Sequence, residues 1–242
     1  MAQNIYDQPD FFAGYSQFRR SIEGLAGAPE WPTLRDMLPP LQGRRVLDLG
    51  CGFGAFVRWA HEAGATHVLG LDLSERMLER AQSLTTDAAI EYRNADIETL
   101  ELPDASFDVV YSSLALHYIE DFARVCATVR RLLTPGGAFV FSVEHPILTA
   151  PANPGWQTDS FGAPVWPVND YLREGPRVTT WITAGVVKQH RTVARYVNDL
   201  VDHGFRIARL VEWGPDAAQI AANPEWAKEV HRPMFLLIGA QL

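Results

Sequence analysis

The chain has 242 residues, a net charge of −8 and 47% hydrophobic residues, which suffices for one α/β domain with a full core. An acidic chain has no general attraction for nucleic acid or anionic membranes, so we expect neither as a partner. Two cysteines, Cys51 and Cys126, are too few for a disulfide framework and favour a reducing, cytoplasmic setting. The first five residues have no basic or apolar region typical of a signal peptide, and no apolar run reaches membrane-spanning length.

Residues 1–40 predict a helical cap that precedes the core and covers the open edge of a sheet. Large apolar side chains follow Pro9 at helical spacing as far as Ile22. A second short helix is predicted from Pro29 to Leu38, where two further prolines end it. Tyr15 and Arg20 are the polar candidates of this segment.

Residues 41–143 predict the core, and its centre is a strand that runs into a glycine-rich turn. The strand carries Val46 to Leu49, the turn carries Gly50, Gly52 and Gly54 on either side of Cys51, and a helical pattern follows at once. Glycine lets the backbone turn tightly and approach a ligand closely. The free N–H groups of the first helical turn point into the same space. The segment therefore indicates a site for a nucleotide-like ligand.

Strand and helix patterns alternate through this core, which favours a parallel sheet with helices on both faces. A carboxylate, Asp72, ends the second strand about twenty residues after the glycine turn, where an acid accepts the hydroxyls of a ribose. Ser74 is an N-cap signal for the next helix. The predicted strands are 44–49, 67–72, 90–94, 107–112 and 138–143, and the predicted helices are 55–63, 74–83 and 121–133.

The composition changes after this core. Residues 144–190 are predicted to form an ordered insertion over the active site, since 144–181 is rich in proline and tryptophan. A plain extension of the core is the alternative. A hairpin is predicted from 177–182 and 186–190 around Ala184 and Gly185. Residues 191–242 predict a helix at 192–203 and the last two strands at 205–213 and 233–240.

The acid and three glycines of Asp48-Leu-Gly50-Cys-Gly52-Phe-Gly54 resemble motif I of the class I S-adenosylmethionine-dependent methyltransferases. Asp48 would face the ligand, where an acid attracts a sulfonium cation and repels a pyrophosphate. The resemblance implies a single domain with a Rossmann-like seven-stranded sheet, mostly parallel with an antiparallel last strand. Gly50, Gly52 and Ala55 also fit the loose dinucleotide pattern, but neither lysine has a tyrosine four residues earlier, so an NAD(P)-dependent oxidoreductase is the weaker alternative.

Further segments resemble later motifs of that family in the same order. Ala95-Asp96 after the third strand resembles its adenine-binding acid, and an Asx-turn in the loop is the alternative for Asp96. Ser112 to Leu114 would pass under the methionine portion, and Tyr15 or Arg20 would reach its carboxylate; packing for Tyr15 and a surface position for Arg20 are the alternatives. The resemblance implies these cofactor-binding residues: Tyr15, Arg20, Asp48, Gly50, Cys51, Gly52, Gly54, Asp72, Leu73, Met77, Ala95, Asp96, Ile97, Ser112, Ser113 and Leu114.

The implied reaction transfers a methyl group from S-adenosylmethionine to a small organic acceptor that the sequence does not identify. His117, Glu144 and His145 are the candidates to contact the acceptor, because they follow the fourth and fifth strands at the carboxyl edge of the sheet. Structural hydrogen bonds for each of them are the alternative. A cofactor-binding regulator without turnover remains open, no metal site is expected, and a monomer and a homodimer are equally compatible with the sequence.

Overall fold

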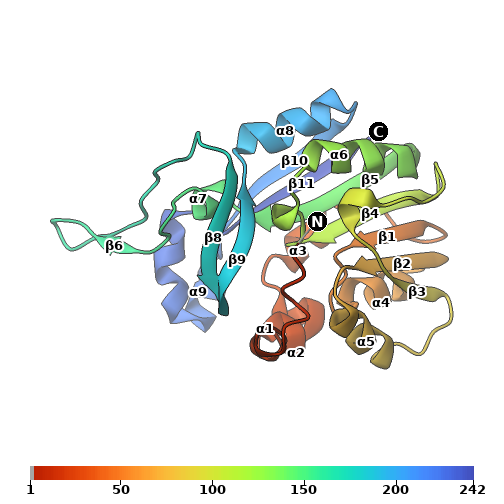
Figure 1. Ribbon diagram of the computed structural model, residues 1–242, viewed down its shortest axis with the longest axis horizontal. Helices are drawn as coiled ribbons and strands as arrows, with labels where there is room; N and C mark the ends of the chain where they lie inside the picture. The colour runs from red at the N-terminus through yellow and green to blue at the C-terminus, as the bar shows by residue number, and fades with distance from the viewer. Residues whose placement is uncertain (1–2) are drawn as a thin grey trace.

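The computed structural model describes residues 3–242, so Met1 and Ala2, which belong to the segment without signal-peptide features, lie outside the described residues. Its centre is one seven-stranded sheet in the order β10-β11-β5-β4-β1-β2-β3 (Figure 1). The neighbours from β5 to β3 run parallel, while β11 is antiparallel to both β5 and β10. The strands are β1 (Arg45–Leu49), β2 (His67–Asp72), β3 (Ile90–Asn94), β4 (Phe107–Ser113), β5 (Leu133–Glu144), β10 (Arg206–Trp213) and β11 (Phe235–Gln241).

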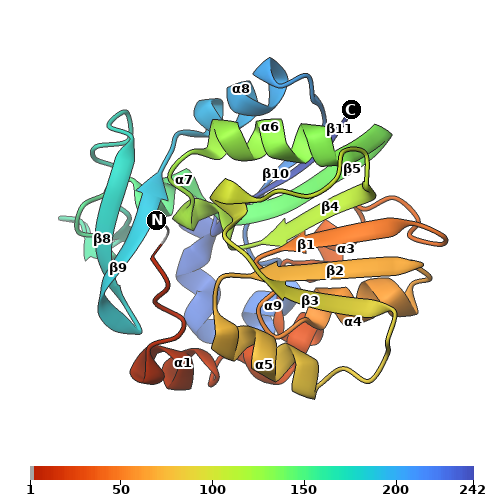
Figure 2. The same ribbon diagram turned by 45° about the vertical axis from the view of Figure 1, so that its right-hand side comes forward.

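Helices cover both faces of this sheet, and the N-terminal helices lie beside a separate hairpin of two strands (Figure 2). This is the Rossmann-like arrangement that the sequence predicts. No helix within residues 3–242 is long and apolar enough to cross a membrane. The helices are α1 (Pro9–Tyr15), α2 (Arg19–Ile22), η1 (Gly24–Gly27), α3 (Trp31–Arg35), α4 (Ala55–Glu62), α5 (Glu75–Ser83), η2 (Ile97–Thr99), η3 (Leu116–Tyr118), α6 (Phe122–Leu132), α7 (Pro146–Thr149), α8 (Val193–Asp202), α9 (Ala217–Ala222) and η4 (Pro224–His231); the short strands outside the sheet are β6 (Gln157–Thr158), β7 (Pro164–Val165), β8 (Gly175–Trp181) and β9 (Thr183–His190).

Two large apolar clusters pack on the sheet, one on each face, and a small third cluster joins Ile5, Phe11 and Val186. Leu47 and Leu49 of β1 point to the face that α6 and α8 cover, and Val46 points to the face that α3 and α4 cover. Successive side chains of a strand alternate between faces, so a strand covered on both sides is apolar throughout. The apolar residues Val46, Leu47 and Leu49 thus suit β1 to the middle of the sheet.

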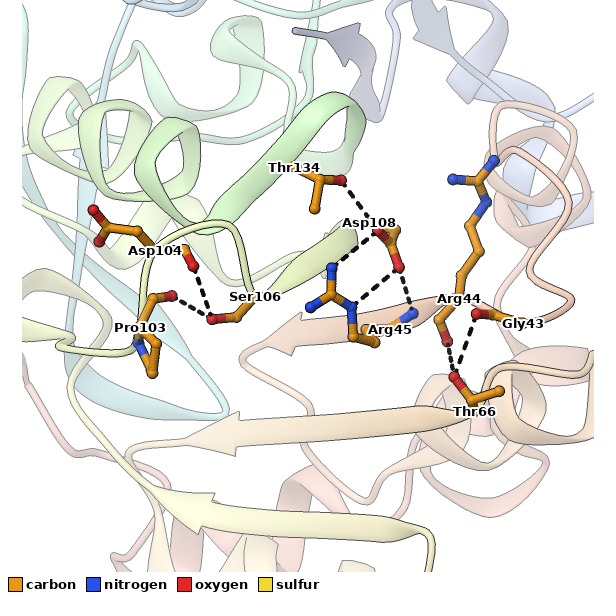
Figure 3. Close-up of polar contacts among 9 residues, drawn as sticks. All are labelled: Gly43, Arg44, Arg45, Thr66, Pro103, Asp104, Ser106, Asp108 and Thr134. Carbon is orange, nitrogen blue, oxygen red and sulfur yellow. Dashed lines mark hydrogen bonds and ion pairs between the residues drawn. The ribbon is translucent and has the colours of Figure 1, made fainter.

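Polar contacts hold the edge of the sheet where β1 and β4 begin. Asp108 accepts a hydrogen bond from the Arg45 backbone N–H at 2.9 Å and another from the Thr134 hydroxyl at 3.1 Å (Figure 3). Ser106 donates to the Pro103 carbonyl close by. The Asp108 pKa is lowered because the bonds from Arg45 and Thr134 outweigh the effect of burial. The side chains of this edge are therefore engaged with one another, and the ligand-facing glycine turn lies at the opposite edge.

Several predicted boundaries are wrong. The helix predicted from Pro29 to Leu38 is limited to α3, Trp31–Arg35. The hairpin turns at Ile182, with Trp181 paired to Thr183, while Gly185 is an extra residue in β9 opposite the Thr179–Thr180 step; a glycine with positive φ suits a bulge as well as a turn. The pattern up to Ile22 forms two helices, since Ser16 and Ser21 hydroxyls bond carbonyls of α1 and such bonds compete with helix continuation. Strand β5 begins at Leu133, and residues 134–137 bulge within it.

The helical pair α9–η4 is absent from the sequence prediction. Asp216 caps α9 by accepting a bond from the Gln219 N–H, and the Gln219 side chain bonds the Asp216 N–H in return. This reciprocal capping box is readable as an acid followed three residues later by glutamine. The short length of α9 and the proline at the start of η4 hide the helical periodicity that prediction relies on.

Replacing Gly54 by alanine is expected to destabilise the protein more than replacing Gly43. Both glycines have positive φ, at 72° and 75°, so both variants carry the left-handed strain of about 1–2 kcal/mol. A Cβ on Gly54 would also overlap the Tyr92 hydroxyl, whereas one on Gly43 meets nothing within 4 Å. We expect about 1–3 kcal/mol of additional loss for Gly54→Ala, measured by urea unfolding. Equal losses would show that Tyr92 moves aside freely.

Candidate active site

A cavity of about 840 Å³ opens at the edge of the sheet where the parallel strands end. Its lining comes from the glycine turn after β1, the ends of β2, β4 and β5, the N-terminal helices, the tip of the β8–β9 hairpin and the α9–η4 pair. A volume of this size is in the range of sites for small ligands. Twelve of the predicted cofactor residues line it: Tyr15, Arg20, Gly50, Gly52, Asp72, Leu73, Met77, Ala95, Asp96, Ile97, Ser113 and Leu114.

The glycine turn presents its backbone to this cavity. Gly50, Gly52 and Gly54 all have positive φ, a conformation that side chains with a Cβ rarely adopt. A Cβ on Gly52 would meet no protein atom within 4 Å, whereas one on Gly50 would overlap the Ala115 side chain. The backbone at Gly52 is therefore open to a ligand, and the backbone at Gly50 packs under the segment that follows β4.

Asp72 is the acid at the cavity wall. Its two carboxylate oxygens accept bonds from the backbone N–H groups of Gly52 and Ser74, each at 2.9 Å. Burial raises the Asp72 pKa to about 6, although these bonds act in the opposite direction. Ser74 caps α5 as predicted, because its hydroxyl oxygen accepts a bond from the Met77 N–H at 3.1 Å. The Ser74 hydroxyl, and not the Asp72 carboxylate, therefore caps α5.

Four predicted cofactor residues do not line the cavity: Asp48, Cys51, Gly54 and Ser112. Asp48 is 2% exposed, and burial together with the charge of Asp72 raises its pKa well above the ordinary value. Ser112 donates a bond to the Leu49 carbonyl at 2.7 Å, between β4 and β1. Cys51 is buried in the apolar cluster between the sheet and the helices α3 and α4. The structure places these four residues behind the ligand-facing surface, where they support the turn.

Arg20 is not a surface charge. Its guanidinium bonds both carboxylate oxygens of Glu30, at 2.9 and 3.1 Å, and Glu30 is fully buried. Burial acts to lower the Arg20 pKa, but Glu30 and Tyr15 raise it, so the group stays a cation. Tyr15 is packed among aromatic rings, including Phe53 and Trp181. Both Tyr15 and Arg20 line the cavity, so the structure brings the two N-terminal candidates to the same wall as Asp72.

Glu144 and His117 lie together at another part of the cavity wall. The His117 Nδ1 accepts a bond from the Glu144 backbone N–H at 3.4 Å, and burial lowers the His117 pKa to about 4. The Glu144 carboxylate accepts a bond from the Lys188 ammonium at 2.5 Å. Lys188 is 5% exposed, and its nitrogen lies 4.8 Å from the centre of the Trp181 ring. A buried cation thus holds the carboxylate that the cavity exposes.

His145 does not line the cavity. Its Nδ1 accepts a bond from the Ile147 N–H at 3.1 Å, which caps α7, and its Nε2 lies 2.9 Å from a Glu212 carboxylate oxygen on β10. Its backbone is extended before Pro146, as the sequence predicts. Burial lowers its pKa although Glu212 acts to raise it. The structural interpretation therefore fits His145 better than contact with an acceptor.

Residues of the predicted insertion contribute little to the cavity. Between 144 and 190 only Glu144 and Trp181 line it. Trp156 and Trp166 instead pack on the Arg232 guanidinium, 5.0 and 4.1 Å from their ring centres. The segment around β6 and β7 extends away from the body of the molecule (Figure 1). The function of the insertion as a lid stays a prediction, and of its tryptophans Trp181 is the one placed to take part in it.

Sequence reasoning missed a large part of the wall. The segment before α1 contributes Tyr6, whose hydroxyl donates to that of Tyr118 at 3.2 Å. The α9–η4 pair was not predicted, although its capping box gave a signal. The wall residues that the prediction lacks are Gln3, Tyr6, Phe18, Arg19, Ala26, Gly27, Pro29, Ala115, Tyr118, Ile119, Trp181, Asp216, Ala218, Gln219, Ala222, Asn223, Trp226, Met234 and Phe235.

Comparison with known proteins identifies the family. A family model described as a methyltransferase domain matches residues 47–141. An S-adenosylmethionine-dependent methyltransferase of Mesorhizobium loti is 57% identical, with a TM-score of 0.87 over 90% of this chain and 100% of that one. A counterpart from Listeria monocytogenes, described as such a methyltransferase without established activity, is 43% identical, with a TM-score of 0.81 over 88% and 98%. A malonyl-[acyl-carrier protein] O-methyltransferase of Erwinia billingiae is 40% identical over 51% of this chain and 48% of its own length. The chain belongs to the S-adenosylmethionine-dependent methyltransferases.

Proposed function

We propose that this methyltransferase acts on a small organic acceptor, which binds in the same cavity as S-adenosylmethionine. The observation that carries the proposal is the continuity of that cavity, which joins the glycine turn and Asp72 to Glu144, His117 and the α9–η4 wall. The cofactor supplies an electrophilic methyl group, and the protein supplies position and a water-poor environment. The cytoplasmic setting remains a prediction from the cysteine content.

The residues present fit the cofactor. The open backbone at Gly52 and the carboxylate of Asp72 suit a ribose, because each Asp72 oxygen keeps a lone pair after its bond to the backbone. Leu73, Met77 and Ile97 provide apolar contacts for an adenine ring. Asp96 accepts a bond from the Glu98 N–H at 2.9 Å, so an adenine amino group would use its second oxygen.

Arg20 and Tyr15 would bind the carboxylate of the methionine portion, with Glu30 keeping the arginine in place. Ser113 and Leu114 would lie beneath that portion at the end of β4. This arrangement leaves Glu144 and His117 for the acceptor, since neither is needed by the adenosine half.

Two measurements test the proposal. Calorimetry should show binding of S-adenosylmethionine and S-adenosylhomocysteine to the purified protein, and a panel of small metabolites should contain compounds that cause release of S-adenosylhomocysteine. Binding without turnover across a broad panel would favour a regulator. Tight binding of NADH with no response to either sulfur compound would overturn the assignment of the cavity.

Affinity for S-adenosylhomocysteine is expected to fall as the pH drops below about 6. The Asp72 pKa is raised to about 6, so above that pH the carboxylate is ionised and accepts bonds from both ribose hydroxyls. Protonation replaces one acceptor by a donor, and the affinity at pH 5 should be about tenfold below its plateau above pH 7. Calorimetric titrations from pH 5 to 8 measure this. The Asp72→Asn variant should bind S-adenosylhomocysteine more weakly than the wild type above pH 7, and its affinity should not change with pH. A wild-type affinity that stays constant down to pH 5 would contradict the role of Asp72.

A further inference from the structure

Glu144 is a carboxylate on the acceptor side of the cavity, and a cation is fixed behind it. Glu144 ends β5, two strands from the glycine turn in the sheet order. Its side chain is 22% exposed, while the side chain of its partner Lys188 is 7% exposed. An approaching molecule therefore meets the carboxylate oxygens, and the ammonium group stays inside the protein. Since the ion pair orders this carboxylate, its position is set before an acceptor arrives.

Neither Glu144 nor His117 is a strong base. Burial acts to raise the Glu144 pKa, but the neighbouring His117 and Lys188 outweigh it and lower the pKa. Burial lowers the His117 pKa to about 4, and its Nδ1 already accepts the Glu144 N–H. Removing a proton from an alcohol before attack needs a base with a pKa nearer the working pH. This pair is instead suited to stabilise positive charge that develops beside it.

Apolar residues form the opposite wall. Ala218, Ala222 and Trp226 are spaced by four residues and all line the cavity, so one face of the α9–η4 pair is turned toward it. The polar neighbours on that face all make hydrogen bonds within the protein: Asp216 accepts from the Gln219 N–H at 2.8 Å, Gln219 donates to the Pro29 carbonyl at 2.9 Å, and Asn223 donates to the Gln219 carbonyl at 3.1 Å. This wall offers contacts to an apolar body and space beside its two alanines.

We propose that the methyl acceptor is an amine with an apolar body, its nitrogen beside Glu144 and its body against the α9–η4 wall. This inference rests on the proposed methyl transfer. The lone pair of the neutral amine forms the new nitrogen–carbon bond while the carbon–sulfur bond of the sulfonium breaks and its electron pair stays on sulfur. The nitrogen becomes cationic, the Glu144 carboxylate stabilises that charge, and the product amine later loses its proton to solvent.

The other acceptor classes fit less well. A carboxylate acceptor would bring a second negative charge beside Glu144, which is repulsive. A hydroxyl acceptor must lose its proton before or during attack, and no strong base stands at this wall. An amine in its neutral form needs no base for attack.

A matched panel tests the class of acceptor. Apolar ring compounds of several sizes are each presented with an amine, a hydroxyl or a carboxylate group, and release of S-adenosylhomocysteine is measured. We expect the amines to be methylated with kcat/KM at least about 10²-fold above the matched hydroxyl compounds, and the carboxylates not to react. Preference for a hydroxyl or carboxylate group, or no methylated amine in the panel, overturns the inference.

The pH profile is a second readout. The titratable and charged groups near enough to Glu144 to interact with its charge are His117, Tyr118, Lys188, Tyr196 and Arg232. If a neutral amine attacks without a base, the rate should rise with pH through the pKa of the amine itself and shift when an amine of different pKa is used. If the pH dependence of the rate is the same for amines of different pKa, the rate is controlled by a titrating group of the protein. That result would contradict attack by a neutral amine without a base.

Ala218→Leu separates this inference from the proposed function. The added side chain reduces the space beside the α9 wall, so kcat/KM should fall for amines with large bodies and much less for small ones, with affinity for S-adenosylhomocysteine unchanged. An equal effect on all bodies contradicts the placement of the acceptor. Failure of the wild type to bind S-adenosylhomocysteine would instead overturn the proposed function.

Discussion

Arg20→Ala is expected to lower the free energy of unfolding by about 3 kcal/mol, because it leaves a fully buried carboxylate without its cation. Glu30 is 0% exposed and both of its oxygens accept bonds from Arg20. Desolvation of an unpaired charge is costly, and the residue that replaces arginine offers no donor. Urea unfolding of the ligand-free protein measures the loss. We place it at the lower end of the usual range since water from the cavity would reach Glu30.

The adjacent Arg19 provides a matched control. It pairs with Glu23 at 3.0 Å, but the two side chains are 61% and 41% exposed, so Arg19→Ala should cost far less stability than Arg20→Ala. A double replacement, Arg20→Met with Glu30→Leu, removes both charges and should recover much of the stability. If Arg20 also binds the cofactor, affinity for S-adenosylhomocysteine stays low in this double variant. Equal losses for Arg19→Ala and Arg20→Ala would contradict the importance of burial.

The sheet and the adenosine half of the site were predictable because local signals specify them. The apolar run of β1, the three glycines and the position of Asp72 each depend on a few consecutive residues. Ser74 at the start of α5 is a capping signal of the same kind. Each of these features is determined within one strand–turn–helix unit, so the prediction did not require knowledge of distant contacts.

The rest of the cavity wall depends on contacts between distant segments. Glu144 is held by Lys188, which is 44 residues away in the chain, and Arg20 is held by Glu30. Trp181 reaches the cavity because the hairpin turns at Ile182 and not at Gly185. His145 was a reasonable candidate by position, but Glu212 of β10 accounts for its ring. Pairings of this kind leave no pattern in a single sequence.

Glu144→Gln is expected to lower kcat by roughly 10²-fold or more once an acceptor is known, with affinity for S-adenosylhomocysteine kept. The amide preserves the size of the side chain and removes the charge that faces the cavity. It also leaves the buried Lys188 without its counter-ion, so the variant loses some stability and its rates must be measured under conditions where it is folded.

Lys188→Met alone should reduce kcat less than Glu144→Gln does, because the Glu144 carboxylate is still present and loses only the ammonium partner that orders it at 2.5 Å.

His145→Ala completes the test, since it removes a neighbouring buried side chain that does not line the cavity. This variant loses the cap of α7 and the contact with Glu212, so it should be less stable but keep kcat within a few-fold of the wild type. If His145→Ala lost most of its kcat while Glu144→Gln kept full turnover, the acceptor would have to bind beside His145, on the other side of β5. Removal of a charge that stabilises the transition state must change kcat. Near-normal turnover in both variants would therefore mean that the Glu144 charge does not contribute and that the reaction depends only on how the two substrates are positioned.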